Sequence, residues 1–254
     1  MGNVLITGAS SGIGRACAEL FAKSGYNLIL NARRIDRLEK LSNDLQQYRI
    51  KTFIKKVDMR NRNEVLEFVE SIPQAFKPID VLINNAGLSR GLEPLDKGNM
   101  DDWDEMIDTN IKGVLYITRA VIGIMRSQGF GHIINIGSIA GHESYPGGNV
   151  YCATKAAIKS LTKSLRMDLI RTNIRVTSVD PGMVETEFSE VRFRDKERAK
   201  KVYENIKPLS AEDVAEVIYF CATRPQHVNI EDVIVTPTQQ VSALINDRDY
   251  KRQN

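Results

Sequence analysis

Tyr151 and Lys155 are the residues of this sequence whose types and spacing most directly indicate chemistry. They stand four positions apart in YCATK, so on a helix both side chains share one face. A nearby cation favours ionisation of a phenol, and it can offset the roughly 4 kcal/mol needed to move a tyrosine pKa from about 10 to about 7. Ser138, directly beyond an apolar run, can donate a hydrogen bond to the same substrate oxygen. These residues predict proton exchange with a hydroxyl or carbonyl group.

A second Y-x-x-x-K segment, YENIK at 203–207, shows that the spacing alone is not decisive. Tyr203 follows no serine-bearing strand, and Pro208 is expected to end the helix that carries it. YCATK, in contrast, is preceded closely by the apolar run HIINI, with Ser138 just past its end. We therefore expect the second copy to be incidental.

The segment TGASSGIG at 7–14 has the composition of a turn that holds phosphate groups. It follows an apolar run and leads directly into a helical pattern, which is the context in which a glycine-rich turn binds a dinucleotide. Glycines let the backbone approach a pyrophosphate, and the helix presents unpaired N–H groups to the anion. The predicted contacts are Gly8, Ser10, Ser11, Gly12, Ile13 and Gly14. With a nicotinamide dinucleotide bound, the cofactor carries the hydride and Tyr151 the proton.

The second apolar run, in YNLILNARR at 26–34, ends in Ala32, Arg33 and Arg34. An acid at this point, about 20 residues after the glycines, would bind a ribose 2′-hydroxyl and repel a 2′-phosphate. Cations have the opposite preference, and one charge-assisted contact of roughly 1.5 to 3 kcal/mol corresponds to roughly 10- to 150-fold discrimination. We predict NADP as the cofactor and both Arg33 and Arg34 as cofactor contacts, with Arg33 as the main 2′-phosphate contact and Arg34 placed to face solvent from the next helix. The alternative is that both arginines belong to a solvated turn.

Short apolar runs alternate with longer amphipathic segments along the chain that carries these motifs. Short β-branched runs are typical of buried parallel strands, and their alternation with helices favours a doubly wound α/β sheet. A chain of 254 residues without internal repeat or linker fits one domain, 1–254, with helices on both faces of the sheet. The expected strands, about seven, are 3–7, 27–30, 52–57, 80–83, 132–136, 175–179 and 232–236.

Composition and charge exclude several classes of protein. The net charge of +3 arises from 35 basic and 32 acidic residues that are interspersed, which argues against a nucleic-acid partner. No apolar stretch reaches the roughly 18 residues that a membrane span requires. No secretion signal precedes the first run and three cysteines form no disulfide framework, so a cytoplasmic protein is expected. The three histidines have no metal-ligand spacing, and no metal is expected.

Together these motifs resemble the short-chain dehydrogenase/reductase family over nearly the whole chain. The resemblance is carried by TGASSGIG, NNAG at 84–87, Asn110, Ser138, YCATK and PGMVET at 181–186. It implies a single Rossmann-type domain and a catalytic set of Asn110, Ser138, Tyr151 and Lys155, in which Asn110 holds a water molecule that links Lys155 to solvent. The further cofactor contacts that it implies are Asp58 and Met59 at the adenine, Asn85, Ala86 and Gly87 at the ribose, Tyr151, Lys155, Pro181 and Gly182, and Val184 and Thr186 at the nicotinamide carboxamide.

Longer segments resemble one branch of that family, the NADP-dependent 3-hydroxy acid dehydrogenases. They are RGLEPLDKGNMDDW, DTNIKGVLYITRAV, GHIINIGSIAG, YPGGNVYCATKAA and FSEVRF. The resemblance implies a small 3-hydroxy acid substrate such as serine, allo-threonine or 3-hydroxypropionate. Such a substrate needs a cation for its carboxylate.

The charged stretch 187–205 departs from the strand and helix pattern and is expected to be a substrate lid. Within it we predict Arg192 as the carboxylate contact, beside Ser138 and Tyr151, with Arg194 as the alternative.

Other functions remain compatible with these residues. The enzyme could reduce other ketones or aldehydes with NADPH, or the fold could serve as a catalytically silent NADP sensor that binds partners. The set of Asn110, Ser138, Tyr151 and Lys155 favours an enzyme. A sugar-nucleotide epimerase or dehydratase with the same Tyr and Lys would need an additional substrate domain, for which the chain is expected to be too short.

The two long helical patterns after Thr109 and Tyr151 carry apolar residues on more than one face. Extra apolar faces predict contacts between copies of the chain, and the family resemblance implies a homotetramer. The residues that indicate these contacts are Val114, Ile117, Val121, Ala156, Leu161 and Leu165. The end of the chain, 246–254, is expected to be a flexible or partner-bound tail.

Overall fold

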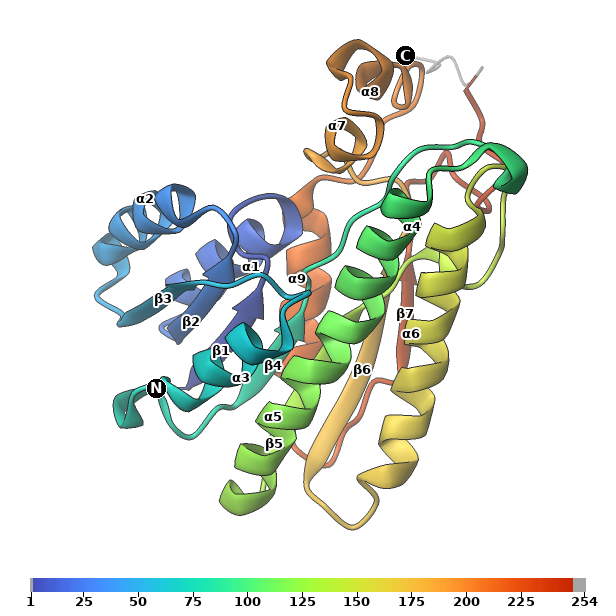
Figure 1. Cartoon of the computed structure of the whole chain (residues 1–254). Helices are drawn as coiled ribbons and strands as arrows, with labels where there is room; N and C mark the ends of the chain where they lie inside the picture. Colours follow the sequence, from blue (N-terminus) through green and yellow to red (C-terminus); the bar gives the residue numbers. More distant parts are fainter. Residues whose placement is uncertain (1, 249–254) are drawn as a thin grey trace.

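The computed structural model describes residues 2–248, which fold around one parallel sheet of seven strands (Figure 1). The strand order is β3-β2-β1-β4-β5-β6-β7, so the chain winds outward from β1 in one direction and then, from β4, in the other. This is the doubly wound arrangement, which brings ligands to the carboxyl ends of the strands near β1 and β4. The strands are β1 (Asn3–Thr7), β2 (Asn27–Ala32), β3 (Thr52–Lys56), β4 (Val81–Asn84), β5 (Gly131–Ile136), β6 (Ile174–Pro181) and β7 (Asp232–Val235).

The sheet confirms the predicted α/β class and each of the seven expected strands. Two strands extend two residues further at their carboxyl ends than expected: β2 continues to Ala32 instead of 30, and β6 to Pro181 instead of 179. Residues 178–181 pair in parallel with 232–235 of β7, and this pairing holds them in the sheet. Asp180 and Pro181 are therefore strand residues at the edge where the site forms.

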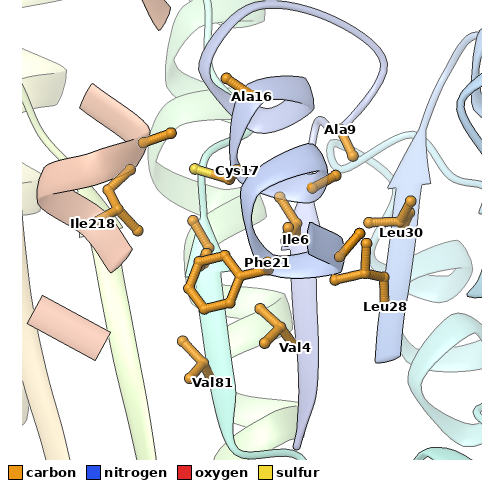
Figure 2. Packing of buried hydrophobic residues seen from close by; sticks show 14 of the residues in the cluster. Val4, Ile6, Ala9, Ala16, Cys17, Phe21, Leu28, Leu30, Val81 and Ile218 are labelled. Carbon is orange, nitrogen blue, oxygen red and sulfur yellow. The ribbon is translucent and has the colours of Figure 1, made fainter. Parts of the chain in front are cut away.

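Helices cover both faces of the sheet and bury alternate strand residues. One face is covered by α1 (Gly12–Lys23), α2 (Ile35–Leu45) and α9 (Ala211–Ala222), and the other by α3 (Arg62–Glu70), α5 (Val114–Gln128) and α6 (Asn149–Asp168). Figure 2 shows Phe21 of α1 packed over Val4 and Val81 on the first face. On the other face Phe68 packs in the same cluster as Leu5. A fully buried side chain of this size contributes roughly 1.5 to 3 kcal/mol, so the two cores fix the strand ends that carry the site.

The expected lid 187–205 contains two short helices beyond the carboxyl edge of the sheet, α7 (Phe188–Phe193) and α8 (Lys196–Lys201) (Figure 1). The expectation that a helix carries Tyr203 to Pro208 is wrong. The helix ends at Lys201, and the chain then turns, with Asn205 in a left-handed conformation at φ 58°. No helix within 2–248 is both long and apolar enough to cross a membrane.

Most of the apolar residues expected at subunit contacts are buried within the chain itself. Ile117, Val121 and Leu165 belong to the core under α5 and α6, and Val114 is also buried. The residues that do leave apolar surface exposed are others, among them Leu115, Met167, Ile170 and Ile234. Ala156 is exposed and Leu161 is half-buried.

The predicted tail 246–254 lies mainly outside the described residues. Its first residues are anchored: Asn246 forms a bridge with Gln240, and the Arg248 guanidinium donates to the carbonyls of Val202 and Glu204 at 3.0 and 2.7 Å. The described part of the tail is thus tied to the lid.

Candidate active site

A cavity of about 660 Å³ opens at the carboxyl ends of the strands. The glycine-rich turn after β1 lines one end, and Tyr151, Lys155 and the lid helix α7 line the other. Of the site residues predicted from the sequence, all but Gly14 and Asn110 line this cavity. An elongated cavity with a phosphate-binding turn at one end and a proton donor at the other has the form of a dinucleotide and substrate site.

The two glycines that bracket the turn are needed because the backbone is crowded there. Gly8 has φ +67°, and a Cβ on it would lie 2.9 Å from the Ala86 Cα. A Cβ on Gly14 would lie 2.6 Å from the Gly8 carbonyl oxygen, so Gly14 serves helix packing and not direct contact with the cavity. Ser11 is the N-cap of α1, but its hydroxyl makes no capping bond. The first N–H groups of α1 therefore have no side-chain partner and are available to an anion.

The arginines after β2 are placed differently from the expectation. Arg34 precedes α2 instead of lying in it, and its guanidinium donates to Ser11 Oγ at 2.8 Å and Ser10 Oγ at 3.3 Å. Its other nitrogen pairs with Glu187 at 2.8 Å. The expectation that Arg34 faces solvent is therefore wrong, because the turn and the start of the lid hold it. Arg33 is the more exposed of the two, and it pairs with Glu105 at 3.3 Å.

Residues 85–87 close the cavity between the turn and the catalytic end. The Thr7 hydroxyl accepts from the backbone N–H groups of Asn85 and Ala86, both at 3.0 Å, and Asn85 Nδ2 donates to the Thr7 carbonyl at 2.9 Å. These bonds join the ends of β1 and β4. The other predicted cofactor residues, Asp58, Met59, Pro181, Gly182, Val184 and Thr186, follow or end neighbouring strands and line the same cavity.

Tyr151 and Lys155 lie on the first turns of α6, as predicted, and both are buried. The Lys155 ammonium lies 5.9 Å from the centre of the Tyr151 ring and donates to the Ile136 carbonyl at 2.8 Å. Ser138, two residues beyond that carbonyl, accepts from the Ala140 N–H at 3.1 Å. The end of β5 thereby places Ser138 and Lys155 beside Tyr151.

Burial dominates the ionisation of these two groups. It raises the pKa of the Tyr151 phenol, and the Ser138 hydroxyl and the Arg192 charge oppose this increase. Burial lowers the pKa of Lys155 to about 8, although the Asp180 carboxylate attracts its charge. The expected fall in the Tyr151 pKa is not found, because burial of the phenol outweighs the opposing effects of Ser138 and Arg192.

Asn110 lies behind the cavity, within a π-helical segment (Asp108–Gly113) between α4 (Met100–Ile107) and α5. Its side chain accepts from the Leu88 N–H at 2.9 Å and donates to the Leu88 carbonyl at 2.8 Å and Thr154 Oγ1 at 3.1 Å. Gly87 stands between it and the lysine: a Cβ there would lie 3.3 Å from Asn110 Oδ1 and 3.7 Å from Lys155 Nζ. Asn110 thus ties the loop after β4 to α6.

The substrate end of the cavity combines a cation with aromatic rings. The Arg192 guanidinium lies 5.5 Å from the ring centres of both Tyr145 and Tyr151, and it donates to Tyr145 Oη at 2.6 Å and to the Gly91 carbonyl at 3.1 Å. Phe188 packs against Tyr151 with ring centres 5.6 Å apart. Arg194 does not line the cavity and pairs with Asp102 instead.

Sequence reasoning missed several residues of this site. Tyr145, six residues before Tyr151, carried the only local signal, the Y-P-G-G turn that leads into α6. Tyr203, treated as incidental, lines the cavity and donates to the Val184 carbonyl at 2.8 Å, so it supports the lid side of the site. Glu105 and Glu187 have no local signal, because they meet their arginines only through the fold.

The histidines have no metal-ligand spacing in the sequence, but the fold brings two acids close to His142. A ring nitrogen of His142 and carboxylate oxygens of Asp180 and Asp232 all lie within 4.8 Å of one another. The His142 Nε2 bonds to Asp180 at 2.6 Å, and its Nδ1 meets the Lys159 ammonium at 2.7 Å. A metal ion would have to displace that ammonium, so the cluster is better described as a hydrogen-bonded charge network.

Comparison with known proteins places this geometry among enzymes. The chain matches the short chain dehydrogenase family over residues 2–244. An NADP-dependent 3-hydroxy acid dehydrogenase of Salmonella typhi is 47% identical over 239 residues, covering 93% of this chain and 95% of that protein. A sulfoacetaldehyde reductase of Chromohalobacter salexigens is 45% identical over 249 residues, covering 97% and 98%. The solved structure of a closed serine dehydrogenase with NADP⁺ has a TM-score of 0.92 and 44% identity, covering 99% of this chain and 100% of that one.

Proposed function

The chain belongs to the short-chain dehydrogenase family and is an NADP-dependent oxidoreductase acting on hydroxyl groups, and from this premise we propose that its substrate is a small 3-hydroxy acid such as serine, allo-threonine or 3-hydroxypropionate. The observation that carries the proposal is the Arg192 guanidinium in the cavity, 5.5 Å from the Tyr151 ring. A cation in this position can bind a carboxylate while the hydroxyl of the same short molecule reaches Tyr151. The family, the cofactor and the enzyme class predicted from the sequence are confirmed.

The residues of the chain act on the proton and on the substrate oxygen. Tyr151 exchanges a proton with that oxygen, and Ser138 donates a hydrogen bond to it. Lys155 supplies positive charge that favours the ionised phenol. Asn110 orders the loop beside Lys155, in the place where a bridging water would complete a relay to solvent. Bound NADP supplies the chemistry of hydride transfer.

The cavity fits NADP in its donors as well as its shape. The N–H groups at the start of α1 would hold a pyrophosphate, and Ser10 and Ser11 would add hydroxyl donors. Arg33 and Arg34 stand at the adenosine end, where a 2′-phosphate would meet two guanidinium groups in place of an acid. Asp58, Met59, Val184 and Thr186 line the same cavity, where the first two would contact the adenine and the last two the nicotinamide carboxamide.

A second candidate is an NADPH-dependent reductase of another small aldehyde or ketone. The same Arg192 would bind a sulfonate as readily as a carboxylate, and one relative of 45% identity is named for sulfoacetaldehyde. Steady-state rates with serine, allo-threonine, 3-hydroxypropionate, sulfoacetaldehyde and a neutral aldehyde, each with NADP(H) and NAD(H), separate these candidates. Turnover confined to the neutral aldehyde would contradict the proposed anionic substrate.

Arg192→Ala tests the anion contact itself. We expect the KM for the 3-hydroxy acid to rise roughly 10- to 150-fold, because one charge-assisted bond of roughly 1.5 to 3 kcal/mol is lost. The matched control is Arg194→Ala, which removes an arginine two residues away that pairs with Asp102 outside the cavity. An unchanged KM in Arg192→Ala would show that the substrate carboxylate binds elsewhere.

We also propose that the enzyme assembles as a homotetramer. Exposed apolar side chains on the described surface support this, and they lie on α5, at the end of α6 and on β7: Leu115, Met167, Ile170 and Ile234. Assembly of copies of the chain would cover such exposed apolar side chains.

A further inference from the structure

A buried carboxylate lies next to the catalytic residues without belonging to the predicted set. Asp180, near the end of β6, has a side chain only 2% exposed. It packs against Gly137, the residue between Ile136, which accepts from the Lys155 ammonium, and Ser138. A side chain at position 137 would overlap the Asp180 carboxylate, so this strand end leaves room for the acid.

The hydrogen bonds of Asp180 show which atoms carry protons. Lysine ammonium groups donate and do not accept, so the Lys159 Nζ contact at 2.7 Å makes His142 Nδ1 an acceptor. The proton of a neutral His142 ring is then on Nε2, which donates to Asp180 Oδ2 at 2.6 Å. Ser178 Oγ donates to the other oxygen at 2.7 Å. Both oxygens accept, which is the pattern of an ionised carboxylate.

The charges around Asp180 come from several elements. Lys155 and Lys159 lie one helical turn apart on α6, His142 lies in the loop after β5, and Asp232 is exposed on β7. Burial and the Asp232 charge raise the pKa of Asp180, while His142 and Ser178 oppose this by bonding to its charged form. Burial and the Asp232 charge outweigh these bonds and raise the pKa of Asp180, so the negative charge beside the Lys155 ammonium depends on the hydrogen bonds that His142 and Ser178 donate to the carboxylate.

We propose that Asp180, held by Ser178 and by His142, which Lys159 orients, is a positioning residue whose charge keeps Lys155 protonated and sets the pH range in which Tyr151 and Lys155 work. Its carboxylate acts on the catalytic pair through the field across Gly137, without touching substrate. The inference rests on the proposed proton transfer by Tyr151 and extends it to residues outside the cavity wall.

Asp180→Asn tests the charge while keeping the shape. Loss of a negative charge favours the deprotonated form of both Tyr151 and Lys155, so both limbs of the pH profile of kcat/KM for alcohol oxidation should move to lower pH by about half a unit to one unit. The affinity for NADP, measured by fluorescence titration, should stay unchanged. If kcat/KM fell by the same factor at every pH and neither limb shifted, Asp180 would have only a packing role, and the inference would be overturned.

Lys159→Met provides the opposite change at a half-buried position. Removing a positive charge favours protonated Lys155, so the alkaline limb should move to higher pH, in the direction opposite to Asp180→Asn. A shift of both variants in the same direction would contradict the inference. If Asp180→Asn does not fold, NMR titration of Lys155 in Lys159→Met measures the same effect without turnover, and an unshifted Lys155 there would overturn it.

Tyr151→Phe distinguishes failure of the proposed role of Asp180 from failure of the proposed proton transfer by Tyr151. We expect turnover to fall at least ~100-fold with NADP binding retained, whereas Tyr48→Phe, at a tyrosine that does not line the cavity, should keep its turnover. Turnover that survives in Tyr151→Phe would refute the proton transfer and the Asp180 inference together. Turnover lost there, with an unshifted profile in Asp180→Asn, would refute the role of Asp180 alone.

Discussion

At the scale of single residues, the two arginines of the cofactor site are held by acids from different parts of the fold. Glu105 on α4 pairs with Arg33, and Glu187 at the start of the lid pairs with Arg34 and Arg37. A 2′-phosphate binding here would compete with these carboxylates. Arg33 is the more exposed and has the weaker contact, so it is the one that can turn to a phosphate at lower cost.

We predict that Arg33→Ser raises the KM for NADP roughly 10- to 150-fold and changes the KM for NAD little, because NAD lacks the 2′-phosphate. Adding Ala32→Asp should move the preference toward NAD, since an acid at that point binds a ribose hydroxyl. Arg37→Ala is the control, because Arg37 shares Glu187 with Arg34 but does not line the cavity. If the unaltered enzyme used NADP and NAD equally well, these arginines would belong to a solvated turn and would not bind the 2′-phosphate.

At the scale of elements, one carboxylate on α4 joins the cofactor site to the lid. Glu105 accepts from Arg90 at 2.7 Å, and Arg90 also donates to the Val191 carbonyl of α7. Burial acts to raise the pKa of Glu105, but hydrogen bonds and attraction from Arg90 and Arg33 outweigh it and lower the pKa. The Glu105 carboxylate therefore stabilises the folded chain wherever it is ionised.

We predict that Glu105→Gln lowers the free energy of unfolding by about 1 to 3 kcal/mol at pH 7, since it leaves the mostly buried Arg90 without its charged partner. A lowered folded-state pKa stabilises above the unfolded value of about 4.3, and this stabilisation is lost as pH falls through the folded value. The difference between the two proteins in urea unfolding should thus shrink below about pH 4. Glu197→Gln, whose pair with Lys200 is exposed, should cost less than about 0.5 kcal/mol. A difference that does not vary with pH would contradict this account of Glu105.

The elements also show what the sequence could and could not predict. Strands and the glycine turn were predictable because buried parallel strands leave continuous apolar runs and a phosphate turn leaves a local spacing. Contacts between distant residues have no such local pattern. Tyr145 meets Arg192 from 47 positions away, and His142 meets Asp180 from 38 positions away. Site residues that belong to a sequence motif were therefore predictable, whereas site contacts between residues of two distant elements were not.

At the scale of the whole molecule, we predict a homotetramer in solution, measured by light scattering after gel filtration. The apolar side chains of Ile170 and Ile234 are more than half exposed, and burying them would favour assembly. Ile170→Glu combined with Ile234→Glu should shift the mass toward dimer or monomer. Lys23→Glu, on the exposed side of α1, is the control and should leave the mass unchanged. A monomer for the unaltered chain would contradict the proposed assembly.

The contact of Arg248 with the lid bears on how the protein should be handled. Its guanidinium donates to the carbonyls of Val202 and Glu204, and both Arg248 and Val202 line the cavity. A fusion that displaces Arg248 would therefore remove a contact that holds the lid. The amino edge of the sheet, where β1 begins at Asn3, lies at the opposite end of the strands from the cavity and is the safer place for an attachment.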